Sequence, residues 1–138
     1  MADVHSLVMR NDLSEVGRMI GWLEDLIPRL RLTTDTAHAL QLCLEEAVTN
    51  VLSHAFEPGG AHDVRVALWC DGPALHAEVE DDGRPFDPLA FEPRAAPKDL
   101  EAAEIGGLGI KLMRSFAQSI SYARCGGTNR LRLTFPTD

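Results

Sequence analysis

A carboxylate and an amide lie one helical turn apart in the segment Glu46–Asn50. A four-residue step places two side chains next to each other on one face of a helix. Glu46 offers a group that can accept a proton, and Asn50 offers an amide oxygen that can bind Mg2+, which needs only one or two protein oxygens when it sits on phosphate groups. The alternative is a solvated helix surface, although Ala39 and Leu42 on the same side indicate a second contact surface.

A second carboxylate, Asp81, ends a segment that alternates like a strand. Counting back by twos reaches the apolar residues of 75–79, so Asp81 is expected to point into the apolar layer. A buried carboxylate is costly without a partner, and the exocyclic amino group of adenine is a donor that it can accept. Gly83 would leave room for the base. Asn129 shares the inward parity of Leu131 and is a further candidate at the edge of an adenine pocket. The alternative is a strand that ends in an acidic turn.

Glycines open a third predicted helix at residues 105–110, which read Ile-Gly-Gly-Leu-Gly-Ile. Gly107 and Gly109 would leave backbone N–H groups uncovered and let phosphate oxygens approach the positive end of the helix dipole. The alternative is a simple helix cap. These two glycines are therefore candidates for a phosphate site.

Hydrophobic periodicity predicts the elements that must position these residues. Helices are expected from Asp12 to about Leu30, with Asp12 and Glu15 as a capping box, and from about Thr34 to Ala55. Alternation predicts strands near 4–9, 64–70, 75–79, 120–124 and 130–135, with a long loop over 84–105. The apolar faces of the two helices comprise Leu13, Val16, Ile20, Leu23, Ile27 and Leu30 in the first and Leu40, Leu44, Ala47, Val48, Val51 and Ala55 in the second.

Antiparallel strands with helices gathered separately predict an α+β fold. We expect a two-layer sandwich in which a mixed or mainly antiparallel sheet is covered on one face by three helices. The length of 138 residues, with 45% hydrophobic and 25% charged residues, fits a single domain over residues 1–138.

The charge and cysteine content restrict the partners and the compartment. A formal charge of -8 disfavours nucleic acid or an anionic membrane as the main ligand. Cys43, Cys70 and Cys125 are odd in number and lack C-x-x-C spacing, so they are expected to be buried thiols in a reducing cytoplasm. The N-terminus does not look like a signal peptide, and no apolar run reaches membrane-spanning length. The protein is therefore expected in the cytosol.

Together these segments resemble the GHKL (Bergerat-fold) superfamily of ATPases and kinases. The shared order is a helix with E-x-x-x-N, a strand ending in D-x-G, a long loop, and G-x-G on a helix. Within the superfamily the chain is similar to the bacterial anti-sigma-factor serine kinases at residues 44–50, 54–56, 83–88 and 106–110, and the resemblance extends from about Ser6 to Phe135. Pro85 departs from it, because many members carry glycine there.

The resemblance implies a role for each matching residue. Glu46 would be the general base, Asn50 would bind Mg2+, Asp81 with Gly83 would recognise adenine, and the two glycines of the third helix would close over the phosphates.

The implied activity is transfer of the ATP γ-phosphate to a serine of a STAS-type anti-sigma antagonist, by a homodimer that also holds a sigma factor. One alternative is a non-catalytic module that binds ATP in order to sequester a regulator. Another, the catalytic half of a histidine kinase, fits less well because no helix bearing a phosphoacceptor precedes the domain in this sequence.

Overall fold

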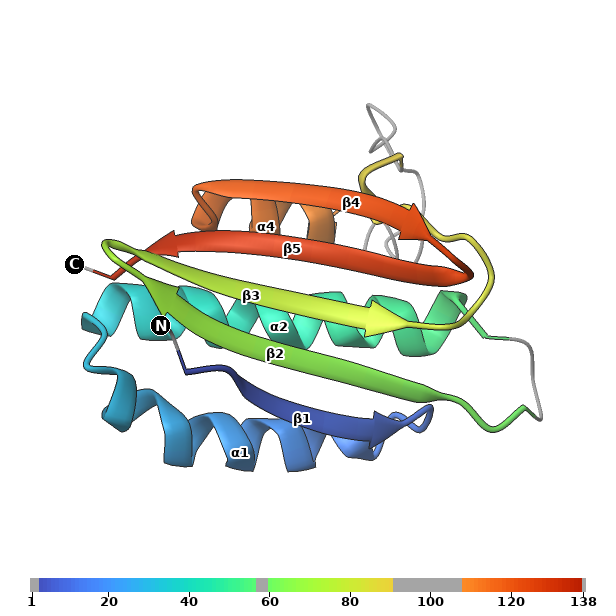
Figure 1. The fold of residues 1–138 in the computed structure, drawn as a ribbon, viewed down its shortest axis with the longest axis horizontal. Helices are drawn as coiled ribbons and strands as arrows, with labels where there is room; N and C mark the ends of the chain where they lie inside the picture. The colour runs from blue at the N-terminus through green and yellow to red at the C-terminus, as the bar shows by residue number, and fades with distance from the viewer. Residues whose placement is uncertain (1–2, 57–59, 91–107, 138) are drawn as a thin grey trace.

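The computed structural model describes residues 3–56, 60–90 and 108–137, which form two layers (Figure 1). One layer is an antiparallel sheet of β1 (His5–Arg10), β2 (Asp63–Asp71), β3 (Ala74–Asp81), β4 (Ser119–Cys125) and β5 (Thr128–Pro136), in the order β1-β2-β3-β5-β4. The other contains α1 (Glu15–Leu30), α2 (Thr34–His54) and α4 (Leu108–Phe116). A short 3-10 helix, η1 (Pro88–Ala90), follows β3. The predicted α+β sandwich is confirmed, with a sheet that is wholly antiparallel.

The start of α1 differs from the prediction. The helix begins at Glu15, and the carboxylate of Asp12 accepts a hydrogen bond from the backbone N–H of Ser14 at 3.0 Å. The side chain of Glu15 pairs with Arg18 at 2.6 Å instead of returning to a capping position. Leu13 precedes the helix and is exposed. The predicted capping box is therefore wrong, because the Asp12 carboxylate accepts its hydrogen bond within a local turn that precedes the helix.

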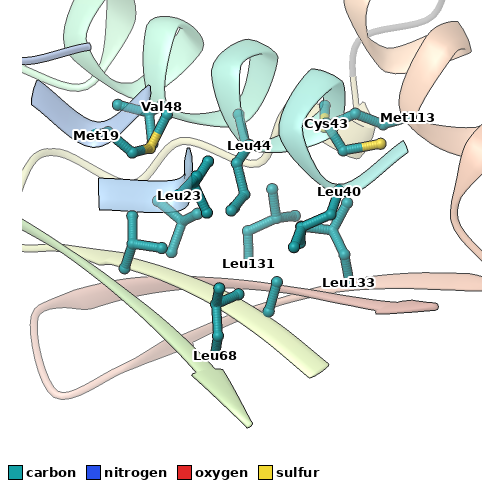
Figure 2. Packing of buried hydrophobic residues seen from close by; sticks show 14 of the residues in the cluster. Met19, Leu23, Leu40, Cys43, Leu44, Val48, Leu68, Met113, Leu131 and Leu133 are labelled. Carbon is teal, nitrogen blue, oxygen red and sulfur yellow. The ribbon is translucent and has the colours of Figure 1, made fainter. Parts of the chain in front are cut away.

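The buried face of α1 is centred on Met19, Leu23 and Leu26. This row is rotated slightly from the predicted one, so that Val16 and Ile27 pack only partly against the core. The remaining core residues lie between the helices and the sheet, as Figure 2 shows for Leu40, Leu44 and Val48 of α2, Met113 of α4, Leu68 of β2, and Leu131 and Leu133 of β5.

Helix α2 lies in the middle of the helical layer, where it contacts α1, α4, β3 and β5 (Figure 1). Every residue of its predicted apolar face is buried. Ala39, on the other side of the helix, is also buried, which supports the predicted second contact surface. A polar side chain on α2 can therefore be deeply enclosed, and Asn50 is, with 8% of its surface exposed.

The three cysteines occupy different environments. Cys43 is buried, Cys70 is half-buried and Cys125 is exposed at the end of β4. The prediction of three buried thiols is therefore wrong for two of them. Both lie next to a hairpin turn, where the helices cover the sheet less, although Cys70 keeps the inward parity of its strand and packs partly against the core. Burial and the nearby Glu46 carboxylate raise the pKa of the Cys43 thiol to about 12.

Candidate functional site

Asp81 lies at the end of β3 and points inward, as the strand parity predicts. It pairs in register with Asn129 of β5, and 3% of its surface is exposed. Its Oδ1 accepts hydrogen bonds from the backbone N–H of Gly83 and from Nδ2 of Asn129, both at 2.9 Å. Burial raises the pKa of the Asp81 carboxyl, and these two hydrogen bonds oppose the rise. The carboxylate is thus held in place by two donors despite its burial.

The segment after Asp81 is attached to the C-terminal end of α2. A Cβ atom on Gly83 would lie 2.4 Å from the carbonyl oxygen of Ala55, far inside contact distance. The backbone N–H of Arg84 donates to that same oxygen at 2.9 Å, and its Nε donates to the carbonyl oxygen of His54 at 2.7 Å. Gly83 is therefore required by the close approach of two backbones, a contact that adds to the predicted need for space beside the base.

Asn129 connects three segments through its side-chain amide. Nδ2 donates to Asp81 and, at 2.7 Å, to the carbonyl oxygen of Arg84. Oδ1 accepts from the backbone N–H of Phe86 at 3.2 Å and from the hydroxyl of Tyr122. Both N–H groups and the oxygen of the amide are thus engaged within the protein.

Two residues of β4 belong to this cluster and were not predicted from the sequence. Tyr122 contacts Asn129, and Nη1 of Arg124 donates to the carbonyl oxygen of Gly83 at 2.7 Å. The positive charge of Arg124 also helps to lower the pKa of the Asp81 carboxyl. Alternation on β4 was the available signal, because both residues share the inward parity that Leu131 and Asn129 have on the neighbouring strand.

Glu46 and Asn50 lie on α2, the helix that holds the Gly83 segment. At 1.5 Å of rise per residue, Asn50 is only about 7.5 Å along the axis from Ala55, and Glu46 is one turn further away. Glu46 is half-buried. The structure gives neither side chain a hydrogen-bond partner among the residues that it describes, and the amide atoms of Asn50 remain in contact with solvent. Both polar groups are accordingly available to a ligand.

The ionisation of Glu46 is shifted in the direction that favours proton transfer. Burial is the larger cause and the neighbouring charge of Glu45 is the smaller one, and both raise the pKa of the Glu46 carboxyl. A base whose pKa is nearer to neutral accepts a proton more readily in the transition state. The arrangement can therefore supply a general base beside a cation-binding amide.

Of the two predicted phosphate-binding glycines, Gly109 lies in the first turn of α4, and Gly107 lies outside the described residues. The first four N–H groups of a helix have no partner within it, and they attract anions. Helix α4 packs against α2, so its first turn belongs to the same helical layer as Asn50.

A separate hollow of about 270 Å³ lies on the face of the sheet that the helices leave uncovered, and it contains none of the predicted site residues. Its lining consists of Val4, Arg65, Ala67, Trp69, Glu78, Glu80 and Arg132. Within residues 3–56, 60–90 and 108–137, no cluster of three or more His, Cys, Asp or Glu side chains could hold a metal ion. None of the helices in these ranges has the length and apolar character needed to cross a membrane.

An antiparallel sheet under three helices, with an inward carboxylate at a strand end and a buried amide on the central helix, places the chain in the two-layer α+β class. Comparison with known proteins gives the family. Residues 9–135 match the model of the histidine kinase-like ATPase domain. The chain belongs to this family.

Its relatives are protein kinases by name. The chain is 37% identical over 114 residues to the serine/threonine-protein kinase BtrW of Bordetella bronchiseptica, covering 82% of this chain and 80% of that protein. It is 29% identical over 103 residues to the serine-protein kinase RsbW of Halalkalibacterium halodurans, covering 72% of this chain and 62% of that protein. The chain is accordingly an ATP-using protein kinase.

The fold is also found in solved structures. A Mycobacterium tuberculosis protein with RsbU and RsbW domains superposes with a TM-score of 0.70 at 12% identity, over 96% of this chain and 31% of that one. The blue-light activated histidine kinase EL346 of Erythrobacter litoralis superposes with a TM-score of 0.59 at 22% identity, over 88% of this chain and 42% of that one. These likenesses confirm the two-layer fold.

Proposed function

We propose that this chain is an anti-sigma regulatory kinase that transfers the γ-phosphate of ATP to a serine of a STAS-type anti-sigma antagonist. We further propose that a homodimer of the chain holds the sigma factor. The observation that carries the kinase assignment is Glu46, a half-buried carboxylate one turn from the buried amide of Asn50 on the helix that anchors the Gly83 segment. The family membership and the names of BtrW and RsbW support it.

The adenine base would be recognised by Asp81. Its Oδ1 is occupied by Gly83 and Asn129, while the structure gives Oδ2 no partner among the described residues. Oδ2 is therefore an acceptor that can receive a hydrogen bond from the exocyclic amino group of adenine, which only donates. A buried carboxylate that pairs with the base also gains back part of the cost of its burial.

The triphosphate would extend from Asp81 toward α2 and α4. The amide oxygen of Asn50 fits Mg2+, which prefers oxygen ligands and keeps most of its contacts with phosphate and water. Mg2+ on the phosphates would neutralise the charge that develops during transfer. Gly109 and Gly107 would contribute backbone N–H groups to the phosphates at the start of α4.

In the transfer step, the serine oxygen of the partner attacks the γ-phosphorus as the bond from that phosphorus to the β-phosphate oxygen breaks. ADP leaves, and the hydroxyl proton passes to the Glu46 carboxylate. Most of the rate enhancement comes from positioning and charge stabilisation, as in other phosphoryl transfers. Glu46 is placed to contribute the remainder because its pKa is raised toward the working pH.

The test uses the purified chain with γ-labelled ATP, Mg2+ and STAS-domain proteins encoded near its gene or captured with it. We expect phosphoserine on one STAS protein, detected by mass spectrometry, and sedimentation of the kinase as a dimer that binds a sigma factor. ATP binding with no transfer to any of these proteins would overturn the proposed STAS-type substrate. A monomer that binds the sigma factor would overturn the dimer proposal.

A further inference from the structure

The orientation of the Asn129 side chain is fixed by backbone groups whose hydrogen-bonding roles are unambiguous. The carbonyl of Arg84 can only accept, and it contacts Nδ2 at 2.7 Å. The backbone N–H of Phe86 can only donate, and it contacts Oδ1 at 3.2 Å. The hydroxyl of Tyr122 donates to the same Oδ1. If the amide were flipped, the contacts with the backbone of Arg84 and Phe86 would both be lost, and Tyr122 would have to accept where it now donates.

This orientation determines what Asp81 can do. With Arg84 and Tyr122 on its other sides, Asn129 presents an N–H group to Asp81 at 2.9 Å, and the backbone N–H of Gly83 does the same. Two donors on one oxygen stabilise the ionised carboxylate, which can only accept. Adenine carries a donor at position six, whereas hypoxanthine and guanine carry a carbonyl oxygen there, which only accepts. A protonated Asp81 could donate to that oxygen, and an ionised one repels it.

We propose that Asn129 and Tyr122 are positioning residues that set the base specificity of the site: Tyr122 orients the Asn129 amide, and Asn129 keeps Asp81 an acceptor, which selects adenine. Asn129 acts through Asp81, because its own amide is engaged by four protein groups. This inference rests on the proposed role of Asp81 in reading adenine, and it extends that role to β4 and β5.

The experiment compares the dissociation constants of ATP and inosine triphosphate for the full chain by calorimetry across a range of pH. The two nucleotides share the sugar and the triphosphate, so titration of the phosphates cancels in their affinity ratio. The unmutated chain should prefer ATP. This preference should fall as the pH falls, because protonation of Asp81 replaces an acceptor with a donor.

Asn129→Asp keeps the size of the side chain but replaces the N–H donors with a second carboxylate. It should lower the ATP preference about 10-fold, the effect of one lost hydrogen bond to a charged group. The pKa of Asp81 should also rise, since a donor is lost and a like charge is gained, so the preference should disappear at a higher pH than in the unmutated chain.

Tyr122→Phe removes one of the two donors to Oδ1 and leaves Phe86, so we expect a reduction of about 2–3-fold, typical of a lost neutral hydrogen bond acting at one remove. If Asn129→Asp does not fold, the ATP preference of Tyr122→Phe alone tests the positioning roles. Ser121→Ala, on the outward face of β4, is the matched control and should leave the ratio unchanged. If Asn129 and Tyr122 had only a structural role, their substitution would weaken the binding of ATP and of inosine triphosphate equally.

Asp81→Asn separates this inference from the proposal beneath it. It should weaken ATP binding roughly 10–100-fold, because a buried acceptor for the amino group is lost. An unchanged affinity ratio in folded Asp81→Asn would overturn the adenine assignment itself. A ratio that changes in Asp81→Asn but stays at the unmutated value and pH profile in folded Tyr122→Phe and Asn129→Asp would overturn the positioning roles alone.

Discussion

Asp81 and Asn50 are both buried polar side chains at the candidate site, but their surroundings differ. Asp81 accepts two hydrogen bonds and belongs to a cluster that joins β3, β4 and β5 to the end of α2. Asn50 has no hydrogen-bond partner within the described parts of the chain, although only 8% of its surface is exposed. One half of the site is internally satisfied, and the other offers its polar groups to a ligand.

This difference matches what each half has to recognise. A rigid base is selected by one donor or acceptor, so the group that reads it benefits from being held still before binding. Phosphates, a cation and an incoming hydroxyl must exchange partners during transfer, so the groups that serve them cannot be saturated by the protein. We infer that the base end, around Asp81, is preorganised, and that the transfer end, around Glu46 and Asn50, is completed by Mg-ATP.

The strongest test of the transfer end is Glu46→Gln. The change keeps the shape of the side chain but removes the proton acceptor, so the rate of phosphorylation should fall by roughly 10²–10⁴ while the affinity for Mg-ATP is retained. Single-turnover transfer to the verified partner and calorimetry with ATP measure the two effects. Glu24→Gln, an exposed carboxylate on α1, is the control. Transfer by Glu46→Gln at the unmutated rate would mean that Glu46 at most positions the substrate.

Gly83→Ala tests whether the base end is built as tightly as the contacts indicate. The new Cβ would lie 2.4 Å from the backbone oxygen of Ala55, so the strand end or the helix end must shift. We expect a loss of about 1–3 kcal/mol in the free energy of unfolding, with weaker ATP binding. Gly21→Ala on α1 is the matched control, because nothing lies within 4 Å of its Cβ position. Equal denaturation midpoints for the two variants would contradict the close approach.

Asn50→Ala addresses the transfer end with a smaller change. The loss of one cation ligand should reduce the Mg2+-dependent gain in ATP affinity by about 10-fold and leave the Mg2+-independent affinity nearly unchanged. Titration of ATP with and without Mg2+ measures both values. Because Asn50 makes no hydrogen bond to another described residue, its removal should cost little stability. A uniform loss of affinity in both conditions would instead assign Asn50 to the nucleotide or to packing.

The two ends also differ in how far the sequence alone predicts them. Strand alternation was enough to place Asp81 and Asn129 inward, since a period of two assigns each residue to a face. The hydrogen bonds from Tyr122 and Arg124 depend on the register between β4 and β5, and the role of Gly83 depends on contact with a helix end far away in the chain. Local patterns carry no information about such contacts.

On the helices, periodicity identified the elements and the apolar face of α2, but not the start of α1 or the burial of Asn50. Asn50 is enclosed because α2 has neighbours on several sides, which depends on the packing of α4 and the sheet around it. The role proposed for Asn50 comes from the resemblance to the kinases, and its enclosed environment comes from the structure.

The smallest expected effect concerns the charge next to the proposed base. Two causes raise the pKa of Glu46, burial first and the Glu45 carboxylate second. Glu45→Gln removes only the second, so the pKa of Glu46 should fall slightly, and the shift should shrink in high salt, which screens partly exposed charges.

A base must be deprotonated to act, so transfer is lost as the pH falls through the pKa of Glu46. The acid limb of kcat in Glu45→Gln should therefore move to lower pH, as pH profiles of kcat at low and high salt would show. Asp81 also has a raised pKa, but its protonation should weaken ATP binding and act on KM. If Glu45→Gln shifts the acid limb of kcat/KM and leaves that of kcat in place, the limb does not belong to Glu46, and the division of the site into a binding end and a transfer end fails.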